Sequence, residues 1–167
     1  MDTQVRKLDY DNIDPEIMKE AGDIIRAGGL VAFPTETVYG LGGDALNPRS
    51  SMKIYAAKGR PSDNPLIVHI EERADLYKIA AKVPEKAEKM MDAFWPGPLT
   101  LIFPKTDRVP SETTGGLDTV AVRMPSDGIA AAFIRAAGGF IAAPSANVSG
   151  RPSTTTAAHV IEDLSGR

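Results

Sequence analysis

Apolar positions along the chain follow two spacings, one typical of amphipathic helices and one typical of buried strands. Helical spacing begins after Asp14-Pro15, a pair that can cap and start a helix, and it ends at Gly28-Gly29. The apolar face of this helix carries Ile17, Ala21, Ile24 and Ile25. The chain therefore opens with an amphipathic helix that needs a surface to pack on.

The same helical spacing recurs along the rest of the chain. It predicts a helix over residues 47–59, opened by an Asn-Pro pair and closed by a glycine, and another that begins at Pro84. Two further helices are predicted over residues 127–137 and 154–164, the last with Ser153 as its cap. Helices thus occur at intervals along the sequence rather than in one block.

Short apolar runs between these helices predict buried strands. The runs cover residues 30–33, 66–70, 99–103, 119–123 and 140–143. Because strands and helices alternate, we expect a single α/β domain over residues 1–167, with a twisted mixed or parallel sheet and helices packed on it. The alternation breaks over residues 104–117, whose Thr, Pro and Gly predict a mobile loop or one that closes over a site.

Length and composition exclude several classes of protein. A chain of 167 residues fits one domain, and the absence of cysteine excludes disulfides, thiolate catalysis and cysteine-bound metals. The first residues are polar with charges of both signs, unlike a signal peptide. No apolar run approaches the roughly 18 residues of a membrane span. We expect a cytoplasmic protein without membrane contact.

The charge is acidic overall but basic in one segment. The net charge of −3 is unlike that of most proteins that bind nucleic-acid backbones. The segment that contains Arg49, Lys53, Lys58 and Arg60 nevertheless has no acidic residue. It is either a solvated helix face or part of a pocket for a small polyanion.

Familiar catalytic motifs are absent from the sequence. There is no P-loop, and although residues 40–45 match Gly-x-Gly-x-x-Ala, the next helix starts too late for a dinucleotide site. Asp63, near the distance of the ribose-binding acid, lies in a predicted loop. His69 and His159 do not form a metal-ligand cluster, so we expect no protein-bound metal.

Polar loops rich in Gly, Pro, Ser and Thr accompany the predicted strands, and such loops line ligand crevices in α/β proteins. They cover residues 34–42, 58–69, 95–100, 119–125 and 143–153. Singly, each is explained by turn chemistry. Together, from about residue 24 onwards, they resemble the Sua5/YrdC/TsaC family of threonylcarbamoyl-AMP synthases. The motifs are Pro34–Gly42, Lys58-Gly59-Arg60-Pro61 with Asn64-Pro65-Leu66, and Ser145-Ala146-Asn147.

The resemblance implies a YrdC-like fold and a reaction of L-threonine, bicarbonate and ATP that forms threonylcarbamoyl-AMP and releases pyrophosphate. It also implies that the product passes to a tRNA-modifying threonylcarbamoyl transferase complex acting on adenosine 37. The anionic carbamate would attack the α-phosphate without a strong base, so the site needs cations. Lys58, Arg60 and Arg123 are the cations available. We expect Lys58 and Arg60 to be catalytic and to lie in a turn outside the core.

Further roles follow from the resemblance. The threonine side is expected to comprise Thr35, Thr37, Lys58, His69 and Arg123, with the choice between the two threonines left open. The ATP side is expected to comprise Arg60, Asn64, Thr119, Ser145, Asn147 and Ser153. Mg²⁺ is expected to arrive with ATP, bound by phosphate oxygens and water rather than by protein ligands.

Two alternatives and one departure remain. The basic segment favours a module that binds tRNA or double-stranded RNA without catalysis. A carbamoyl-AMP-handling domain of a hydrogenase-maturation factor is also related, although such factors have zinc-finger-like cysteines elsewhere. Family members continue beyond the position of Arg167 with a strand and further ligand-binding residues. We therefore expect the synthase domain to be C-terminally incomplete, with low stability and activity.

Overall fold

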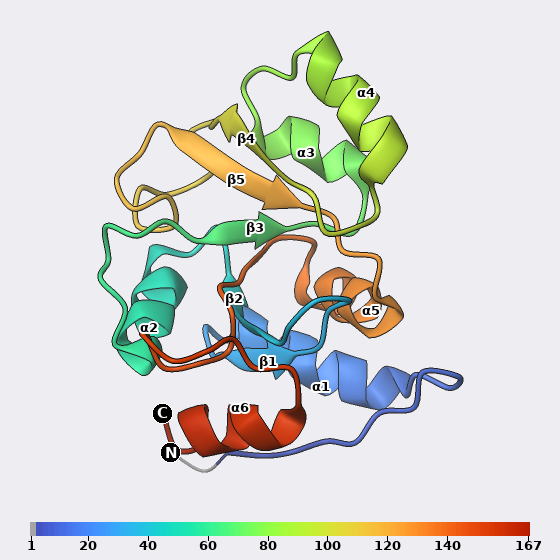
Figure 1. The fold of residues 1–167 in the computed structure, drawn as a ribbon, viewed down its shortest axis with the longest axis vertical. Coiled ribbons are helices and arrows are strands. Elements are labelled where there is room, and N and C mark those ends of the chain that lie inside the picture. Colours follow the sequence, from blue (N-terminus) through green and yellow to red (C-terminus); the bar gives the residue numbers. More distant parts are fainter. Residues whose placement is uncertain (1–2) are drawn as a thin grey trace.

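A mixed sheet runs through the middle of the molecule, with helices on both of its faces (Figure 1). The computed structural model describes residues 3–167, and within them six strands form this sheet in the order β1-β2-β6-β3-β5-β4. The strands are β1 (Val31–Phe33), β2 (Gly40–Asp44), β3 (Ile67–His69), β4 (Thr100–Pro104), β5 (Thr119–Arg123) and β6 (Ile141–Ala142). The predicted α/β class is confirmed.

Strands β3 and β5 are parallel, whereas the other neighbouring pairs are antiparallel. The sheet is therefore mixed, which is one of the two forms predicted, mixed or parallel. In the parallel pair His69 lies opposite Arg123, so these two side chains project from the same face at the same edge. Val68 and Val122 project from the opposite face into the core. Strand register thus places two of the predicted site residues next to each other.

The helices are α1 (Pro15–Arg26), α2 (Pro48–Lys58), α3 (Arg73–Ile79), α4 (Glu85–Phe94), α5 (Gly128–Ala137) and α6 (Ala157–Leu164). Helices α1 and α5 lie side by side on one face of the sheet (Figure 1). Their apolar sides bury Ile25 and Phe133 against Phe33 and Ile141. Asp14 caps α1 by accepting a hydrogen bond from the amide of Glu16, as its position before Pro15 predicts.

The second and larger core lies on the opposite face. Residues from α2, α3 and α4, among them Ile54, Leu76 and Met91, pack there with Val68 and Phe103. Each buried side chain of this size contributes about 1.5–3 kcal/mol relative to an exposed one. No helix within residues 3–167 is long and apolar enough to cross a membrane.

Strand β2 was predicted as part of a glycine-rich loop, and the structure corrects this. A Cβ atom on Gly42 would lie 2.9 Å from Cγ2 of Ile141 and 3.1 Å from the Phe33 ring. Glycine is therefore needed for close packing within the sheet. The Gly-x-Gly-x-x-Ala match has this structural origin, since its first two glycines, Gly40 and Gly42, lie in a strand rather than at the start of a helix.

Two further local predictions are wrong. The cap of α6 is Thr156, whose side chain accepts a hydrogen bond from the amide of His159, and not Ser153. The segment 104–117 is a loop anchored to the core by buried Val109, Thr113 and Thr114, and it does not line the cavity described below. The Thr113 hydroxyl donates to the carbonyl of Ala45 at 2.8 Å, and Val109 is fully buried.

Candidate active site

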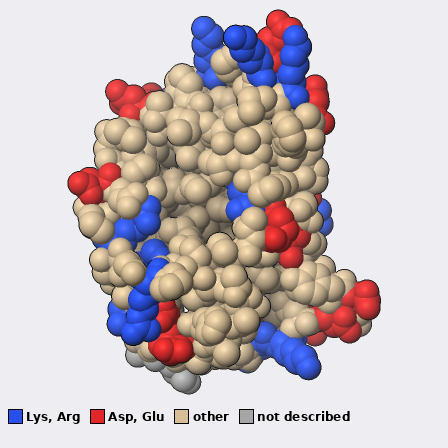
Figure 2. Space-filling view, in the orientation of Figure 1, with Lys and Arg blue, Asp and Glu red and all other residues tan. Residues whose placement is uncertain are grey.

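A cavity of about 310 Å³ opens where β3 and β5 meet the turn before β2 and the segment after β6. Figure 2 shows a hollow in the middle of this face, with basic side chains on both sides of it. Residues predicted for the site that line the cavity are Thr35, Arg60, His69, Arg123 and Ser145. They come from five separate segments, so the fold brings them together.

His69 and Arg123 form one wall of this cavity. His69 is 4% exposed, and its ring meets the Phe33 ring edge-on at 6.1 Å between centroids. Burial, assisted by the positive charge of Arg123, lowers the pKa of His69 to about 4. Its imidazole is therefore neutral near pH 7. A neutral ring can donate one hydrogen bond and accept another, which suits recognition of a hydroxyl group.

The turn between β1 and β2 is attached to Arg123. The Nη2 atom of Arg123 donates to Oε1 of Glu36 at 2.8 Å and to the Thr37 hydroxyl at 3.2 Å. The Thr35 hydroxyl donates to the carbonyl of Val38 at 2.6 Å and lies 3.1 Å from the Thr37 hydroxyl. Thr35 lines the cavity, whereas Thr37 does not and instead accepts a hydrogen bond from Arg123.

Arg60 lines another part of the cavity, next to Pro65 before the start of β3, and it has uncharged partners. Its Nη2 atom donates to Oδ1 of Asn64 at 2.6 Å and to the carbonyl of Pro65 at 3.1 Å, and Nε donates to the carbonyl of Asn64 at 3.2 Å. None of the ion pairs found within residues 3–167 involves Arg60. Asn64 thus orients the guanidinium group of Arg60, whose charge remains available to a ligand. Both residues were predicted for the ATP side of the site.

Lys58 is not in an exposed turn, which corrects the sequence expectation. It is the last residue of α2 and is 1% exposed. Its Nζ atom donates to the carbonyls of Ser145 and Asn147, the second at 2.5 Å. Burial lowers the pKa of Lys58 to about 8, and the nearby charge of Arg60 acts in the same direction. In this arrangement Lys58 holds the segment after β6 in place, and it does not line the cavity.

The segment 145–147 is shaped by its own hydrogen bonds as well as by Lys58. Asn147 is 5% exposed, and its Nδ2 atom donates to the carbonyls of Val148 and Arg151, each at 2.9 Å. Its Oδ1 atom is buried and has no partner among the described residues. Asp163 of α6 accepts a hydrogen bond from the amide of Val148 at 3.0 Å. The loop is therefore attached to both α2 and α6.

Two predicted ATP-side residues, Thr119 and Ser153, are exposed and do not line the cavity. Thr119 begins β5, on the same sheet face as Arg123 but at the other end of the strand. Ser153 precedes Thr154, whose carbonyl accepts a hydrogen bond from the amide of Tyr39 at 2.9 Å. Sequence reasoning missed Glu36, although it stands between the two predicted threonines.

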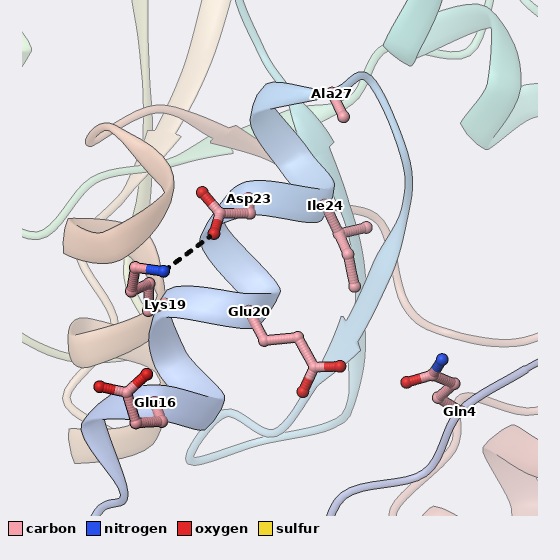
Figure 3. Close-up of a pocket in the computed structure, with 7 residues that line it drawn as sticks. All are labelled: Gln4, Glu16, Lys19, Glu20, Asp23, Ile24 and Ala27. Atoms are coloured by element: carbon pink, nitrogen blue, oxygen red, sulfur yellow. Dashed lines mark ion pairs between the residues drawn. The ribbon is translucent and has the colours of Figure 1, made fainter.

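A second hollow, of about 480 Å³, lies against the outer side of α1 (Figure 3). It is larger, but Glu16, Glu20 and Asp23 give it an acidic lining, and Lys19 is paired with Asp23 at 3.7 Å. Carboxylates repel phosphates, and none of the predicted site residues is present. The hollow between Arg60 and Arg123 is therefore the candidate active site.

Known proteins resemble the chain in sequence and in fold. The family model Sua5/YciO/YrdC, described as "Telomere recombination", matches residues 23–167. The chain is 56% identical to a threonylcarbamoyl-AMP synthase of Bacillus subtilis, over 92% of this chain and 44% of that protein. It is also 56% identical to a threonylcarbamoyl-AMP synthase of Pyrococcus abyssi, over 88% of this chain and 43% of that protein.

Among solved structures, that of P. abyssi Sua5 complexed with L-threonine superposes with a TM-score of 0.90 at 55% identity, over 91% of this chain and 45% of that one. The chain thus spans less than half the length of these relatives. Since the family model matches most of the sequence, and does so with the predicted motifs in place, the chain belongs to the Sua5/YciO/YrdC family.

Proposed function

We propose that this chain is the adenylate-forming domain of an L-threonylcarbamoyladenylate (threonylcarbamoyl-AMP) synthase. The reaction joins L-threonine, bicarbonate and ATP, and it releases pyrophosphate and water. The observation that supports it best is the cavity that Arg60 and Arg123 both line. Relatives at 56% identity are threonylcarbamoyl-AMP synthases, and the P. abyssi protein has been crystallised with L-threonine.

The wall made by β3 and β5 suits the amino acid. Arg123 can receive its carboxylate, since a guanidinium group binds a carboxylate through two parallel hydrogen bonds. Neutral His69 and the hydroxyl of Thr35 are the groups available for the threonine hydroxyl. A site that pairs with a hydroxyl rejects an analogue without one, because its own polar groups would stay unpaired.

The part of the cavity lined by Arg60 and Ser145, here called the Arg60 wall, suits the nucleotide. Arg60, held by Asn64, faces the cavity, and Ser145 lies on the segment that Lys58 and Asn147 shape. Two anions, the carbamate and the α-phosphate, must meet between the walls. Like charges about 4 Å apart repel by roughly 4 kcal/mol at an effective dielectric constant near 20. Fixed cations offset this repulsion while the carbamate oxygen forms a bond to phosphorus and pyrophosphate leaves.

Mg²⁺ fits this scheme as a companion of ATP. Within residues 3–167 no group of three or more His, Asp or Glu side chains could hold a metal ion. The cavity offers guanidinium and hydroxyl groups instead, which can donate hydrogen bonds to phosphate oxygens. We propose that the triphosphate and water bind the metal, which would screen the phosphate charge during the attack.

We further propose that the domain acts in the cytoplasm and that its product is used by a tRNA-modifying threonylcarbamoyl transferase complex. The RNA-binding alternative is less well supported, because the basic segment 49–60 is not a continuous surface. Lys53 donates to the carbonyl of Gly28 at 2.6 Å, and Lys58 is buried. A carbamoyl-AMP-handling domain of a hydrogenase-maturation factor is also less well supported, because the two relatives at 56% identity are threonylcarbamoyl-AMP synthases.

Pyrophosphate release tests the proposed function. With ATP, Mg²⁺ and bicarbonate, L-threonine should support release, whereas L-valine should support far less, because it replaces the hydroxyl by a methyl group. Omission of bicarbonate is the matched control and should abolish the threonine signal. Equal rates with threonine and valine, or a rate independent of bicarbonate, would contradict the assignment.

A further inference from the structure

Glu36 does not line the cavity itself, but it is paired with Arg123, which does, so its negative charge lies one side chain away from the cavity. The Arg123 and Glu36 side chains are 11% and 20% exposed, and Nη2 lies 2.8 Å from Oε1. Burial on its own would raise the pKa of Glu36. Hydrogen bonds from Arg123 and from the backbone of Glu36 and Ser126 outweigh burial and lower the pKa. Glu36 is therefore an ionised carboxylate at neutral pH.

Arg123 is not fully used by this pair. Its Nη2 atom serves both Glu36 and Thr37, whereas its buried Nε atom has no hydrogen-bond partner among residues 3–167. A buried donor without a partner is costly, and a ligand oxygen would relieve that cost. Since Arg123 lines the cavity, it can bind a ligand carboxylate and Glu36 at the same time.

The two walls of the cavity therefore differ in net charge. Arg60 is surrounded by uncharged oxygens of Asn64 and Pro65, so its wall is positive and suits a polyphosphate. Arg123 is balanced by Glu36, so its wall is neutral overall but has separated charges. A free amino acid has the complementary pattern, with a carboxylate for Arg123 and an ammonium group for Glu36.

We propose that Glu36 is a specificity-determining residue, which selects a zwitterionic amino acid at the Arg123 wall over a simple carboxylic acid or a phosphate. This inference rests on the proposed function, because it assigns the Arg123 wall to threonine. The carboxylate of Glu36 attracts the ammonium group of the substrate. A simple carboxylic acid or a phosphate has no positive group and gains nothing from this attraction.

Binding measurements with two ligands test this role. L-Threonine and (R)-3-hydroxybutanoate share the carboxylate and the hydroxyl group, but the second lacks the ammonium group. Titration calorimetry should show that the unaltered protein prefers threonine by about tenfold or more, as expected for hydrogen bonds between charged groups. In Glu36→Gln, threonine should bind about tenfold more weakly and hydroxybutanoate equally well or more tightly.

The matched control is Glu88→Gln. Glu88 lies on α4, away from the cavity, and its carboxylate pairs with Arg73 of α3. This substitution should leave the preference for threonine unchanged. Thermal melts of both variants show whether they fold. A second variant, Thr37→Val, removes the other Nη2 acceptor but keeps the charge, and it should retain the preference.

The outcomes separate the two ideas. If Glu36→Gln binds both ligands as the unaltered protein does, or weakens both equally, Glu36 only positions the turn and the inference is overturned. If Glu36→Gln does not fold and Thr37→Val loses the preference, the inference is overturned as well. If the unaltered protein does not bind threonine, both the proposed function and the role of Glu36 are wrong.

Discussion

Arg60 and Arg123 have the same side chain, but their neighbours adapt them to different ligands. Arg60 donates three hydrogen bonds to uncharged oxygens, which orient it and leave its charge uncompensated by protein. Arg123 instead shares Nη2 between a carboxylate and a hydroxyl. Because guanidinium groups stay charged and planar in proteins, we expect these partners to decide which anion each arginine would bind under the proposed function. The residue types alone do not distinguish the two roles.

Replacement of Arg60 tests this difference. Arg60→Lys should raise KM for ATP by about tenfold or more, because lysine is a point charge and cannot reproduce the planar fork. KM for threonine should change little, and so should the melting temperature. Steady-state pyrophosphate release with each substrate varied in turn gives both constants. The matched control is Arg49→Lys, on the exposed side of the same basic segment. A variant Arg60→Lys with normal KM for ATP would argue against a nucleotide at this wall.

His69 should make the free energy of unfolding depend on pH. Its pKa is about 4 when folded and near 6.5 when unfolded, so between these values the unfolded chain binds the extra proton. The free energy of unfolding should therefore fall by about 2 kcal/mol from pH 7 to pH 5. Urea titrations at both pH values measure it, and His69→Gln should lack the effect. His159→Gln, at an exposed position of α6, should retain it. Equal pH dependence in His69→Gln would contradict this account.

At the scale of elements, the glycines of strand β2 are explained by the side chains that pack against them. A Cβ atom on Gly40 would lie 3.2 Å from the Phe33 ring, and one on Gly43 would lie 3.1 Å from Ile54 and from Leu30. Glycine weakens strand propensity, yet a larger residue at these positions would press against its neighbours. Packing on both sides of the sheet thus decides the residue type of this strand.

Gly42→Ala tests that explanation. The added methyl would lie within 3.0 Å of Ile141, so the sheet must shift, and we expect the free energy of unfolding to fall by about 1–3 kcal/mol. Gly128→Ala is the matched control, because its Cβ atom would meet nothing closer than 3.9 Å, at Ile13. Its stability should be unchanged or slightly higher. Denaturant unfolding of the two variants measures both effects, and equal stabilities would contradict the packing argument.

The elements that sequence predicts well are those with local signals at their ends. Helix α2 is capped at its start by Asn47, whose side chain accepts a hydrogen bond from the amide of Arg49, and at its end by Gly59 in the left-handed conformation with φ of 62°. Both signals are visible in the sequence. Helix α3 was missed because it has only seven residues and no side-chain cap. Strand β2 was missed because its glycines serve contacts between distant segments.

The same distinction applies to the candidate site. Cavity-lining residues such as Arg60 and Ser145 stand in recognisable motifs, so sequence identifies them. The position of Lys58 depends on the arrival of the Ser145 and Asn147 carbonyls at the end of α2, which is a property of the fold. The pairing of Glu36 with Arg123 likewise joins residues far apart in sequence. Motifs therefore identify which residues gather, and tertiary structure decides which of them face the ligand.

For the molecule as a whole, the surface carries charges of both signs, whereas the charged side chains that line the cavity are two arginines. The net charge is −3, yet Arg60 and Arg123 line the same hollow. Elsewhere, Figure 2 shows the basic side chains near the α3–α4 end mixed with acidic ones. Ion pairs there include Lys89 with Glu85 at 2.7 Å and Lys78 with Asp75 at 2.6 Å. Such an arrangement suits a small polyanion better than a long nucleic-acid backbone.

RNA binding is the whole-molecule test of this distribution. A duplex RNA should bind no more tightly than about 10 µM at physiological salt, which is within the non-specific range. The logarithm of its association constant should fall with the logarithm of salt concentration with a slope no steeper than about −3, since few cations are available to neutralise phosphates. ATP should compete with the RNA, because both would use Arg60, and Arg60→Ala should weaken the two together. Fluorescence anisotropy over a salt series measures the slope, with Arg49→Ala as the control outside the cavity. A slope near −6 that ATP and Arg60→Ala leave unchanged would reveal a separate RNA surface, and the charge distribution would then have to be read as that of an RNA-binding protein.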